Sequence, residues 1–289
     1  MLDQFLYTIH QTYPNLAIED ASLNQDGQYN HVVIVNNALV FRFARFAESA
    51  QTLRQETSIL KAIQEYITLE IPNPTYVNLD SPTPEKNFVG YSMIPGIPLW
   101  REAFEQITNE AVLNRMADQI ADFLKELHSI PLQHVLSLGL VNSDGRPYWM
   151  DLYQRFQAKL FPHMSVEGQD RVVEHFMNFL DNPERFAYEP VLRHGDFGGG
   201  NLIFDEQAGQ MAGVIDFGFA ELGDPAIDIG GLFGFGEAFV ERCVGSYPEI
   251  EEMLERVHFY QGTFALQEAL YGVEHDDPEA FEDGIAEYQ

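Results

Sequence analysis

The sequence predicts an α+β protein with a small N-terminal lobe built on an antiparallel sheet and a larger, mainly helical C-terminal lobe. Short β-rich runs separated by turn residues fill the first third of the chain. Beyond Pro98 the apolar residues recur at three- and four-residue steps, which is typical of amphipathic helices. One compact β insertion, Val191–Phe217, interrupts the helical part. We expect lobes of residues 1–93 and 94–289 with a cleft between them.

The N-terminal lobe is predicted to contain two hairpins and a helix. The β-rich runs His31–Asn37 and Ala38–Arg45 meet at the turn-forming Asn36-Asn37 pair. A helical stretch follows over Glu48–Glu65. The segments TYVNL and FVGYSMI flank the proline-rich DSPTPEKN and indicate a second hairpin. The segment Pro95–Pro98 breaks the pattern and is typical of a linker between lobes.

The C-terminal lobe is predicted to consist of helices around the β insertion. The apolar stripe of one long helix is formed by Ala111, Val112, Met116, Ile120, Phe123, Leu124 and Leu127. Further helical stretches are predicted over Tyr153–Phe161, Gly168–Leu180, Gly236–Val244, Glu249–Leu270 and Pro278–Tyr288. Inside the insertion, NLIF and MAGVID are separated by DEQAGQ and indicate an antiparallel hairpin.

The charge balance limits the classes of partner. The chain of 289 residues has 45 acidic against 16 basic side chains, a formal net charge of -29. Such a surface repels nucleic acids and anionic membranes and attracts cations. Solubility, or adaptation to the host's internal milieu, explains this charge, and so does a polycationic substrate. Charge alone does not choose between these interpretations.

The sequence also indicates the cellular compartment. A single cysteine, Cys243, excludes an intramolecular disulfide and a zinc site of several cysteines. The first residues lack the basic segment and apolar run of a signal peptide, and no apolar stretch approaches the length of a membrane span. We expect a cytoplasmic monomer that binds a small molecule.

The stretch RHGDFGGGNLIFD, Arg193–Asp205, places His, Asp and Asn around three consecutive glycines, which cost backbone entropy on folding. With the hairpin turn centred near Ala208, we expect Asn201 and Asp216 to face each other across the strands. Their oxygens suit Mg²⁺, which binds one or two carboxylates together with phosphate and water. Asp196 is then available to accept a proton from an attacking hydroxyl. Turn formation explains each residue singly, but it does not explain the combination.

A second candidate pair lies in the N-terminal lobe. Glu56 falls on the apolar stripe of the predicted helix, three residues after Leu53 and four before Leu60. A carboxylate on a buried face needs a cationic partner. Strand alternation offers Arg42, which faces away from Leu39, Phe41 and Phe43. Kinases position their phosphate-binding cation in this way, and a purely structural ion pair is the alternative.

These motifs together resemble one family. HGDFGGGN fits the catalytic loop H-x-D-x-x-x-x-N, and VIDFG fits the metal-binding segment, of the aminoglycoside phosphotransferase and choline-kinase-like superfamily. GDPAIDIG is similar to the stretch that follows there, GYSMIPGIPL resembles the hinge, and FLKELHSIP resembles the helix before the catalytic region. The motifs occur in the family's order from about residue 20 to the end. YGVEHDDPEAFEDGIAEY is most similar to the branch that phosphorylates the 2″-hydroxyl of aminoglycosides.

The resemblance implies a protein-kinase-like fold and transfer of a γ-phosphoryl group from ATP or GTP, with Mg²⁺, to a small-molecule hydroxyl. It implies that Asp196 is the catalytic base and that Asn201 and Asp216 are the Mg²⁺ ligands. It implies that Arg42 and Glu56 hold the phosphates. The backbone expected to pair with the purine is that of Ser92, Met93 and Ile94.

The chain departs from the family pattern in two places. Arg42 stands where the family usually has lysine; arginine keeps the charge and binds phosphate bidentately, but it is bulkier. Arg45 is a second candidate for this role, although alternation places it on the other strand face. The expected phosphate-covering loop, LNQDGQYN, has a single glycine, Gly27. His194 matches the first motif position and is expected to brace the loop.

Candidate residues for a cationic substrate come from the last third of the chain. Glu237 and Glu241 are four residues apart and share one helix face. Tyr271 would provide an aromatic wall, with Glu268 one helical turn before it. A solvated acidic face is the alternative for these glutamates.

Three functions follow from these patterns. The first is a nucleotide-dependent phosphotransferase acting on a cationic aminoglycoside or a similar compound. The second is a metabolic kinase for choline, homoserine, a macrolide or a sugar. The third is a nucleotide-binding protein with little catalysis, which the arginine at position 42 leaves open. The choice between ATP and GTP depends on the space near Tyr91 and Met93.

Overall fold

The computed structural model describes residues 1–24, 29–142 and 144–289. These residues form two compact units. Unit 1 comprises Met1–Ile130 and Gly199–Ala220, and unit 2 comprises Pro131–Gly198 and Glu221–Gln289. The chain therefore enters unit 1 for the second time inside the glycine-rich stretch. The predicted lobes 1–93 and 94–289 have other limits, and that functional division stays a prediction.

Unit 1 is built on an antiparallel sheet with the strand order β1–β2–β3–β5–β4. The strands are β1 (Ala21–Asn24), β2 (Asn30–Val35), β3 (Leu39–Ala44), β4 (Tyr76–Asn78) and β5 (Phe88–Ser92). The helices are α1 (Leu2–Thr12), α2 (Ala47–Ile63), α3 (Arg101–Glu105) and α4 (Glu110–His128). Both predicted hairpins are confirmed. Asn36 and Asn37 adopt φ values of 55° and 49°, a left-handed conformation that asparagine tolerates in tight turns.

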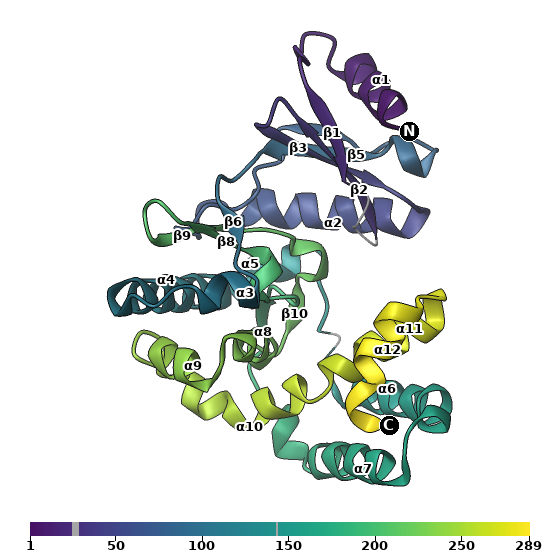
Figure 1. The fold of residues 1–289 in the computed structure, drawn as a ribbon, viewed down its shortest axis with the longest axis vertical. Coiled ribbons are helices and arrows are strands. Elements are labelled where there is room, and N and C mark those ends of the chain that lie inside the picture. Colours follow the sequence, from purple (N-terminus) through teal and green to yellow (C-terminus); the bar gives the residue numbers. More distant parts are fainter. Residues whose placement is uncertain (25–28, 143) are drawn as a thin grey trace. The chain divides into compact units, whose positions relative to one another are not determined.

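The helices α1 and α2 cover opposite faces of this sheet (Figure 1). Phe5 and Ile9 of α1 pack against Phe41 and Phe43 of β3. On the other face, Leu53 of α2 packs with sheet and loop residues in a second buried cluster. Because successive strand residues point to opposite faces, the residue between the two phenylalanines faces α2.

A second, smaller sheet in unit 1 contains β6 (Ile97–Pro98), β8 (Leu202–Asp205) and β9 (Gln210–Val214), in the order β6–β8–β9. The expected linker Pro95–Pro98 therefore carries a strand. The predicted β8–β9 hairpin is confirmed, but the expected register is wrong by one residue. Leu202 pairs with Val214, and a bulge lies between Ile203 and Phe204.

The register correction changes which residues face each other. Ile215, rather than Asp216, is opposite Asn201, and its N–H donates to the Asn201 carbonyl at 2.9 Å. Counted evenly from the turn-closing pair Asp205–Gln210, Asn201 would face Val214, and the bulge, which adds one residue to β9, shifts its partner to Ile215. Asn201 and Asp216 still lie at the same end of the hairpin.

Unit 2 is mainly helical, with a short two-stranded ladder. Its helices are α5 (Leu132–Ser137), α6 (Arg146–Lys159), α7 (Val166–Leu180), α8 (Ala226–Leu232), α9 (Glu237–Val244), α10 (Ile250–Gln261), α11 (Phe264–His275) and α12 (Pro278–Ile285). The ladder pairs β7 (Val191–Arg193) with β10 (Glu221–Gly223), antiparallel. Within the described residues, no helix is long and apolar enough to cross a membrane.

The single helix expected over Glu249–Leu270 is two helices, α10 and α11. The chain breaks at Gly262 and Thr263, where the Thr263 side chain is fully buried and donates to the Tyr260 carbonyl at 2.7 Å. A Cβ on Gly262 would lie 2.6 Å from the ring of His175 in α7. Close packing at the break therefore requires glycine there.

Candidate active site

Arg42 of β3 joins two carboxylates in unit 1. Its Nη1 donates to Glu56 Oε1 of α2 at 2.5 Å, and its Nη2 donates to Asp216 Oδ1 at 2.9 Å. Asn30 Oδ1 accepts from the same Nη2 at 3.1 Å when its amide is oriented to suit its neighbours. The predicted Arg42–Glu56 pair is confirmed, and Arg42 rather than Arg45 makes it.

The pair is buried, whereas Asp216 is partly open. The side chains of Arg42 and Glu56 are 9% and 4% exposed, against 42% for Asp216. Burial alone would lower the pKa of Arg42, but Asp216 and Glu56 outweigh it and hold that pKa well above its usual value. Burial raises the pKa of Glu56, and the Arg42 charge opposes this rise. Glu56 also accepts the Phe217 N–H at 3.2 Å.

Asp216 occupies a backbone conformation that aims its side chain. Its φ of 63° is left-handed, which costs energy for any residue other than glycine. Its Oδ1 accepts the Gly218 N–H at 3.4 Å as well as the Arg42 donor. The next residue, Phe217, is fully buried. The buried phenylalanine and the Asp216 turn together fix the carboxylate beside Arg42.

Asn201 and Asp216 are the candidate metal ligands, and their chemistry fits Mg²⁺. Both supply hard oxygen donors at one end of the β8–β9 hairpin. Among the described residues there is no group of three or more His, Cys, Asp or Glu side chains that could hold a metal ion. Magnesium needs no such cage, because it keeps waters and binds phosphate oxygens alongside one or two carboxylates.

The backbone after β5 offers hydrogen-bonding groups for a nucleotide base. The Met93 N–H donates to the Ala38 carbonyl at 2.8 Å, which extends the β3–β5 ladder. In an antiparallel ladder the backbone groups alternate in direction, so those of Ser92 and Ile94 point away from β3. Tyr91, just before them, is buried, and burial raises its pKa to about 12.

The expected phosphate-covering loop cannot be compared with its prediction, because residues 25–28, including Gly27, lie outside the described part of the chain.

Asp196, the candidate base, belongs to unit 2 and is solvent-exposed, whereas His194, two residues before it, and Phe197, directly after it, are buried. His194 is 0% and Phe197 3% exposed. The Asp196 N–H donates to His194 Nδ1 at 3.3 Å, and the Gly198 N–H donates to the Asp196 carbonyl at 3.0 Å. These contacts support the expectation that His194 braces the loop.

A buried carboxylate anchors the same loop from α8. Asp228 is 0% exposed, and its two oxygens accept the N–H groups of His194 and Gly195, each at 2.8 Å. Gly195 has a φ of 84°, a conformation that favours glycine. The backbone that leads into Asp196 is therefore fixed at two consecutive residues.

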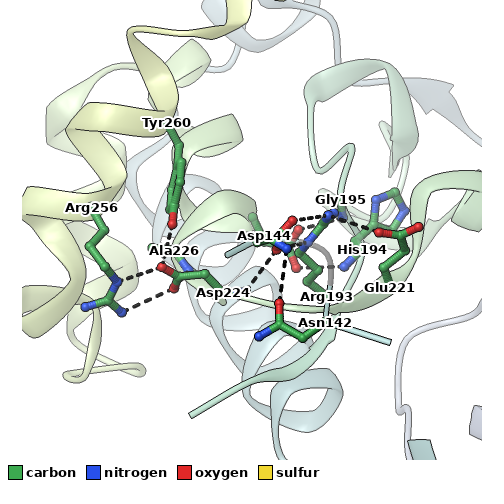
Figure 2. A network of polar contacts seen from close by, with 11 residues as sticks. Asn142, Asp144, Arg193, His194, Gly195, Glu221, Asp224, Ala226, Arg256 and Tyr260 are labelled. Carbon is green, nitrogen blue, oxygen red and sulfur yellow. Dashed lines mark hydrogen bonds and ion pairs between the residues drawn. The ribbon is translucent and has the colours of Figure 1, made fainter. Parts of the chain in front are cut away.

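A larger polar network continues from this anchor (Figure 2). Arg193 makes a bidentate ion pair with the buried Asp144, at 2.8 and 2.9 Å. Asp144 also accepts the N–H of Asp224, which is itself fully buried and receives Arg256 Nε at 2.7 Å and Tyr260 Oη at 2.8 Å. Buried charges need partners of this kind, so the network joins β7, β10 and α10 into one rigid support.

Two of the four candidate substrate residues line a pocket in unit 2. The pocket, of about 550 Å³, is lined by Phe233, Glu237, Val240, Glu241, Val244, Glu251, Leu254 and His258. Glu237 and Glu241 project from α9, as their spacing predicts, and Glu251 is added from α10. The pocket combines an apolar lining with three carboxylates.

The other two candidates, Glu268 and Tyr271, lie on α11 outside that pocket. The Tyr271 ring stacks on His275 one turn later, with centroids 4.1 Å apart. Burial, aided by Asp283 and Asp277, raises the pKa of Glu268. The structure thus does not bring the four candidates together at this pocket.

Comparison with known proteins decides the family. The model of the phosphotransferase enzyme family matches residues 20–260. The chain belongs to this phosphotransferase enzyme family. Viomycin phosphotransferase from Streptomyces vinaceus is 30% identical over 270 residues, which are 91% of each chain. Aminoglycoside 3'-phosphotransferase from Salmonella typhimurium is 26% identical over 192 residues, 65% of this chain and 64% of that protein.

Solved structures of this family confirm the predicted fold. A GDP and kanamycin complex of an APH(2") enzyme has a TM-score of 0.90 at 24% identity and covers 98% of this chain and 96% of its own. The GDP complex of wild-type aminoglycoside 2'-phosphotransferase-IIIa has a TM-score of 0.90 at 22% identity, with 98% and 95% covered. The protein-kinase-like arrangement of an antiparallel N-terminal sheet followed by helices is therefore that of aminoglycoside phosphotransferases.

The buried aspartates that support the Asp196 loop, Asp144, Asp224 and Asp228, were not predicted from the sequence. Asp228 and Asp224 belong to the run GDPAIDIG, which was recognised only as a family segment. The two aspartates are four residues apart and enclose a proline and apolar residues. This pattern was a signal that their carboxylates are buried and accept hydrogen bonds. Nothing near Asp144 in the sequence indicates that it pairs with Arg193, 49 residues away.

Proposed function

We propose that the protein transfers the γ-phosphoryl group of ATP or GTP, with Mg²⁺, to a hydroxyl of a cationic antibiotic. One observation carries this proposal: a buried strand cation, Arg42, is held by Glu56 of α2 and touches Asp216. A purely structural ion pair does not need the third partner. In a member of a phosphotransferase family, this arrangement places a cation that can bind phosphate, Arg42, next to a carboxylate that can bind the metal, Asp216.

In the proposed site, each residue of unit 1 has a distinct task. Arg42 binds phosphate oxygens, and Glu56 orients it. Asn201 and Asp216 hold Mg²⁺, which neutralises phosphate charge when bound. The backbone groups of Ser92 and Ile94 pair with the base. The Met93 backbone N–H already donates to the Ala38 carbonyl, so the hydrogen bonds to the base come from Ser92 and Ile94.

In unit 2, Asp196 is the proposed catalytic base. Its carboxylate accepts the proton of the acceptor hydroxyl as that oxygen bonds to the γ-phosphorus. The bond from the γ-phosphorus to the β,γ-bridging oxygen breaks, and the nucleoside diphosphate leaves. Asp228 and His194 act on this step by holding the Asp196 backbone in place.

The acid-lined pocket of α9 and α10 supports a cationic acceptor. Its three glutamates supply charges for ammonium groups, and its apolar residues supply a surface for a carbon skeleton. The net charge of -29 adds a long-range attraction for polycations. The antibiotics named with related proteins, such as viomycin, kanamycin and gentamicin, define the class to be tested.

The proposal is tested with a substrate panel. Purified protein is incubated with MgATP or MgGTP and with kanamycin, gentamicin, streptomycin or viomycin, and with a macrolide and choline as outgroups. We expect nucleoside diphosphate release that depends on one or more cationic antibiotics, with a phosphorylated product of 80 mass units added, about the mass of one phosphoryl group replacing a proton. Turnover of choline or a macrolide alone would refute the proposed substrate class. Absence of turnover with every compound would refute the proposed reaction.

A further inference from the structure

Trp100 follows β6 in unit 1, and its ring lies beside Gly200, the residue before the candidate metal ligand Asn201. The β6–β8 ladder pairs Ile97 with Phe204 and Pro98 with Ile203. The Leu99 N–H donates to the Leu202 carbonyl at 2.8 Å and continues this register. The next register position places Trp100 opposite Asn201. The residue directly before Trp100 is therefore held by a backbone hydrogen bond to β8.

The indole rests on the glycine-rich stretch. A Cβ on Gly200 would lie 2.3 Å from Trp100 Cη2 and 2.8 Å from two further ring atoms. No side chain fits there without moving the ring. One of the three consecutive glycines is thus explained by contact with Trp100 and not by chain flexibility. Gly200 directly precedes Asn201, so the ring is packed at the phosphate-binding end of the proposed nucleotide site.

Despite this support, Trp100 is 60% exposed, whereas the preceding Leu99 is fully buried. Burial of a large apolar side chain stabilises a fold, but most of the surface of Trp100 faces solvent. An exposed indole face attracts ammonium groups through the ring quadrupole and packs against the C–H face of a saturated ring. The position combines ring atoms packed on Gly200 with a largely exposed indole.

We infer that Trp100 forms an aromatic subsite for the acceptor, with a saturated, positively charged ring stacked on its exposed face. This inference rests on the proposed function. In the proposed site, the backbone of Ser92 and Ile94 binds the base of the nucleotide. Trp100 instead lies near Asn201, at the end of the site where the reacting phosphates bind. The compound that must approach this end is the acceptor. A polycation is also the ligand that the acidic surface favours.

The sequence provides a direct optical test, since it has two tryptophans. Trp149 is 3% exposed and packs against Phe259 and Tyr260. In a Trp149→Phe variant, Trp100 is the sole tryptophan. We expect its emission to change on titration with the panel antibiotic that has the highest kcat/KM, and to stay constant on titration with MgADP.

Steady-state kinetics provide the second measurement. Trp100→Ala should raise the KM for that antibiotic about 2- to 30-fold, the range expected from the loss of one cation–π contact. The KM for the nucleotide should stay unchanged, and Trp100→Phe should recover part of the loss. Tyr7→Ala is the matched control, because Tyr7 is an aromatic residue of similar exposure on α1. It should leave both constants unchanged.

The outcomes separate the inference from the proposed function. If MgADP changes the Trp100 emission and the antibiotic does not, the indole belongs to the nucleotide site and the inference is wrong. It is also wrong if Trp100→Ala leaves the KM for the antibiotic unchanged while the wild type turns that antibiotic over. If the wild type phosphorylates no compound of the panel, the proposed function and the inference with it are both refuted.

Discussion

Arg42 Nη2 donates to Asp216 Oδ1 at 2.9 Å while Arg42 Nη1 donates to Glu56 at 2.5 Å. One guanidinium thus links the helix α2 to the segment that carries the candidate metal ligand. A guanidinium presents diverging donors in a fixed plane, whereas a lysine ammonium is a compact point charge on a flexible stem. The arginine in place of the usual lysine therefore does more than preserve charge. It holds Asp216 and Glu56 in a fixed relation through one rigid side chain.

The first prediction concerns this arginine. Arg42→Lys should keep the Glu56 pair and the charge that binds phosphate, so the protein should remain active although the second, fixed link to Asp216 is lost. Arg42→Ala should weaken MgATP binding and lower the free energy of unfolding by about 3 kcal/mol, since it leaves a buried carboxylate unpaired. Urea denaturation and nucleotide titration measure the two effects. A fully active Arg42→Ala protein would remove Arg42 from the proposed phosphate site.

The same variant has a pH signature. Without Arg42, burial raises the pKa of Glu56 with less opposition, above the usual 4.5 of the unfolded chain. The folded state then keeps a proton that the unfolded state releases. Its stability should therefore fall further below wild type as the pH rises from about 5 to 8. The control Arg42→Met/Glu56→Leu removes both charges and should recover stability, but not nucleotide binding.

The second prediction concerns the proposed base. Asp196→Asn should lower kcat at least about 100-fold, because the amide cannot accept the hydroxyl proton. MgATP affinity should be unchanged, since the candidate nucleotide residues all belong to unit 1. Rapid-quench kinetics with the panel antibiotic, together with nucleotide titration, separate the two effects. Near-full turnover by Asp196→Asn would assign proton transfer to another group.

The third prediction concerns Asp228 as a positioning residue. Asp228→Asn keeps one acceptor oxygen and should lose one of the two N–H contacts to the loop. We expect kcat to fall about tenfold, a smaller loss than for a catalytic base, with the KM for the antibiotic little changed. Hydrogen exchange at the Gly195 amide reports the loosened loop directly. A loss of stability with kcat unchanged would make Asp228 a purely structural residue.

The fourth prediction concerns the metal. Asp216→Asn and Asn201→Ala should each raise the Mg²⁺ concentration needed for half-maximal ATP binding, with the larger effect for Asp216 because it removes a charge. Chelation with EDTA should abolish nucleotide-dependent turnover in the wild type. Asp205→Asn, at the far end of β8, is the matched control. If both variants keep the wild-type Mg²⁺ dependence, the metal must bind elsewhere.

The sequence predicted contacts that arise from one periodic element facing another. The contact between Arg42 and Glu56 was predicted from the side-chain alternation of a strand and the side-chain spacing of a helix. Both periods are regular along β3 and α2. The expected pairing of Asn201 with Asp216 was one residue out of register, because neither the turn-closing pair Asp205–Gln210 nor the bulge after Ile203 has a simple sequence signature. Strand pairing beyond a bulge must be read from the structure.

Buried polar networks cannot be predicted from the periodicity of the sequence. Asp144, Asp224 and Asp228 are residue types that are rarely buried, and each is buried here because partners arrive from distant segments. The space for the Arg193–Asp144 pair depends on Gly223, where a Cβ would lie 1.9 Å from Asp144 Oδ2. Such a requirement involves three segments at once and is visible only after folding.

The last prediction concerns the acid-lined pocket of α9 and α10. Glu237→Gln and Glu241→Gln should each raise the KM for the panel antibiotic and weaken its dependence on salt, because each removes one charge that attracts ammonium groups. The KM for ATP should not change. Glu268→Gln is the matched control, since it removes an equal charge on α11 outside the pocket. A loss of net negative charge alone would affect all three variants equally, whereas a pocket site affects the first two only. If Glu268→Gln raises the KM and the pocket variants do not, the acceptor binds at α11, and Tyr271 returns as its aromatic wall.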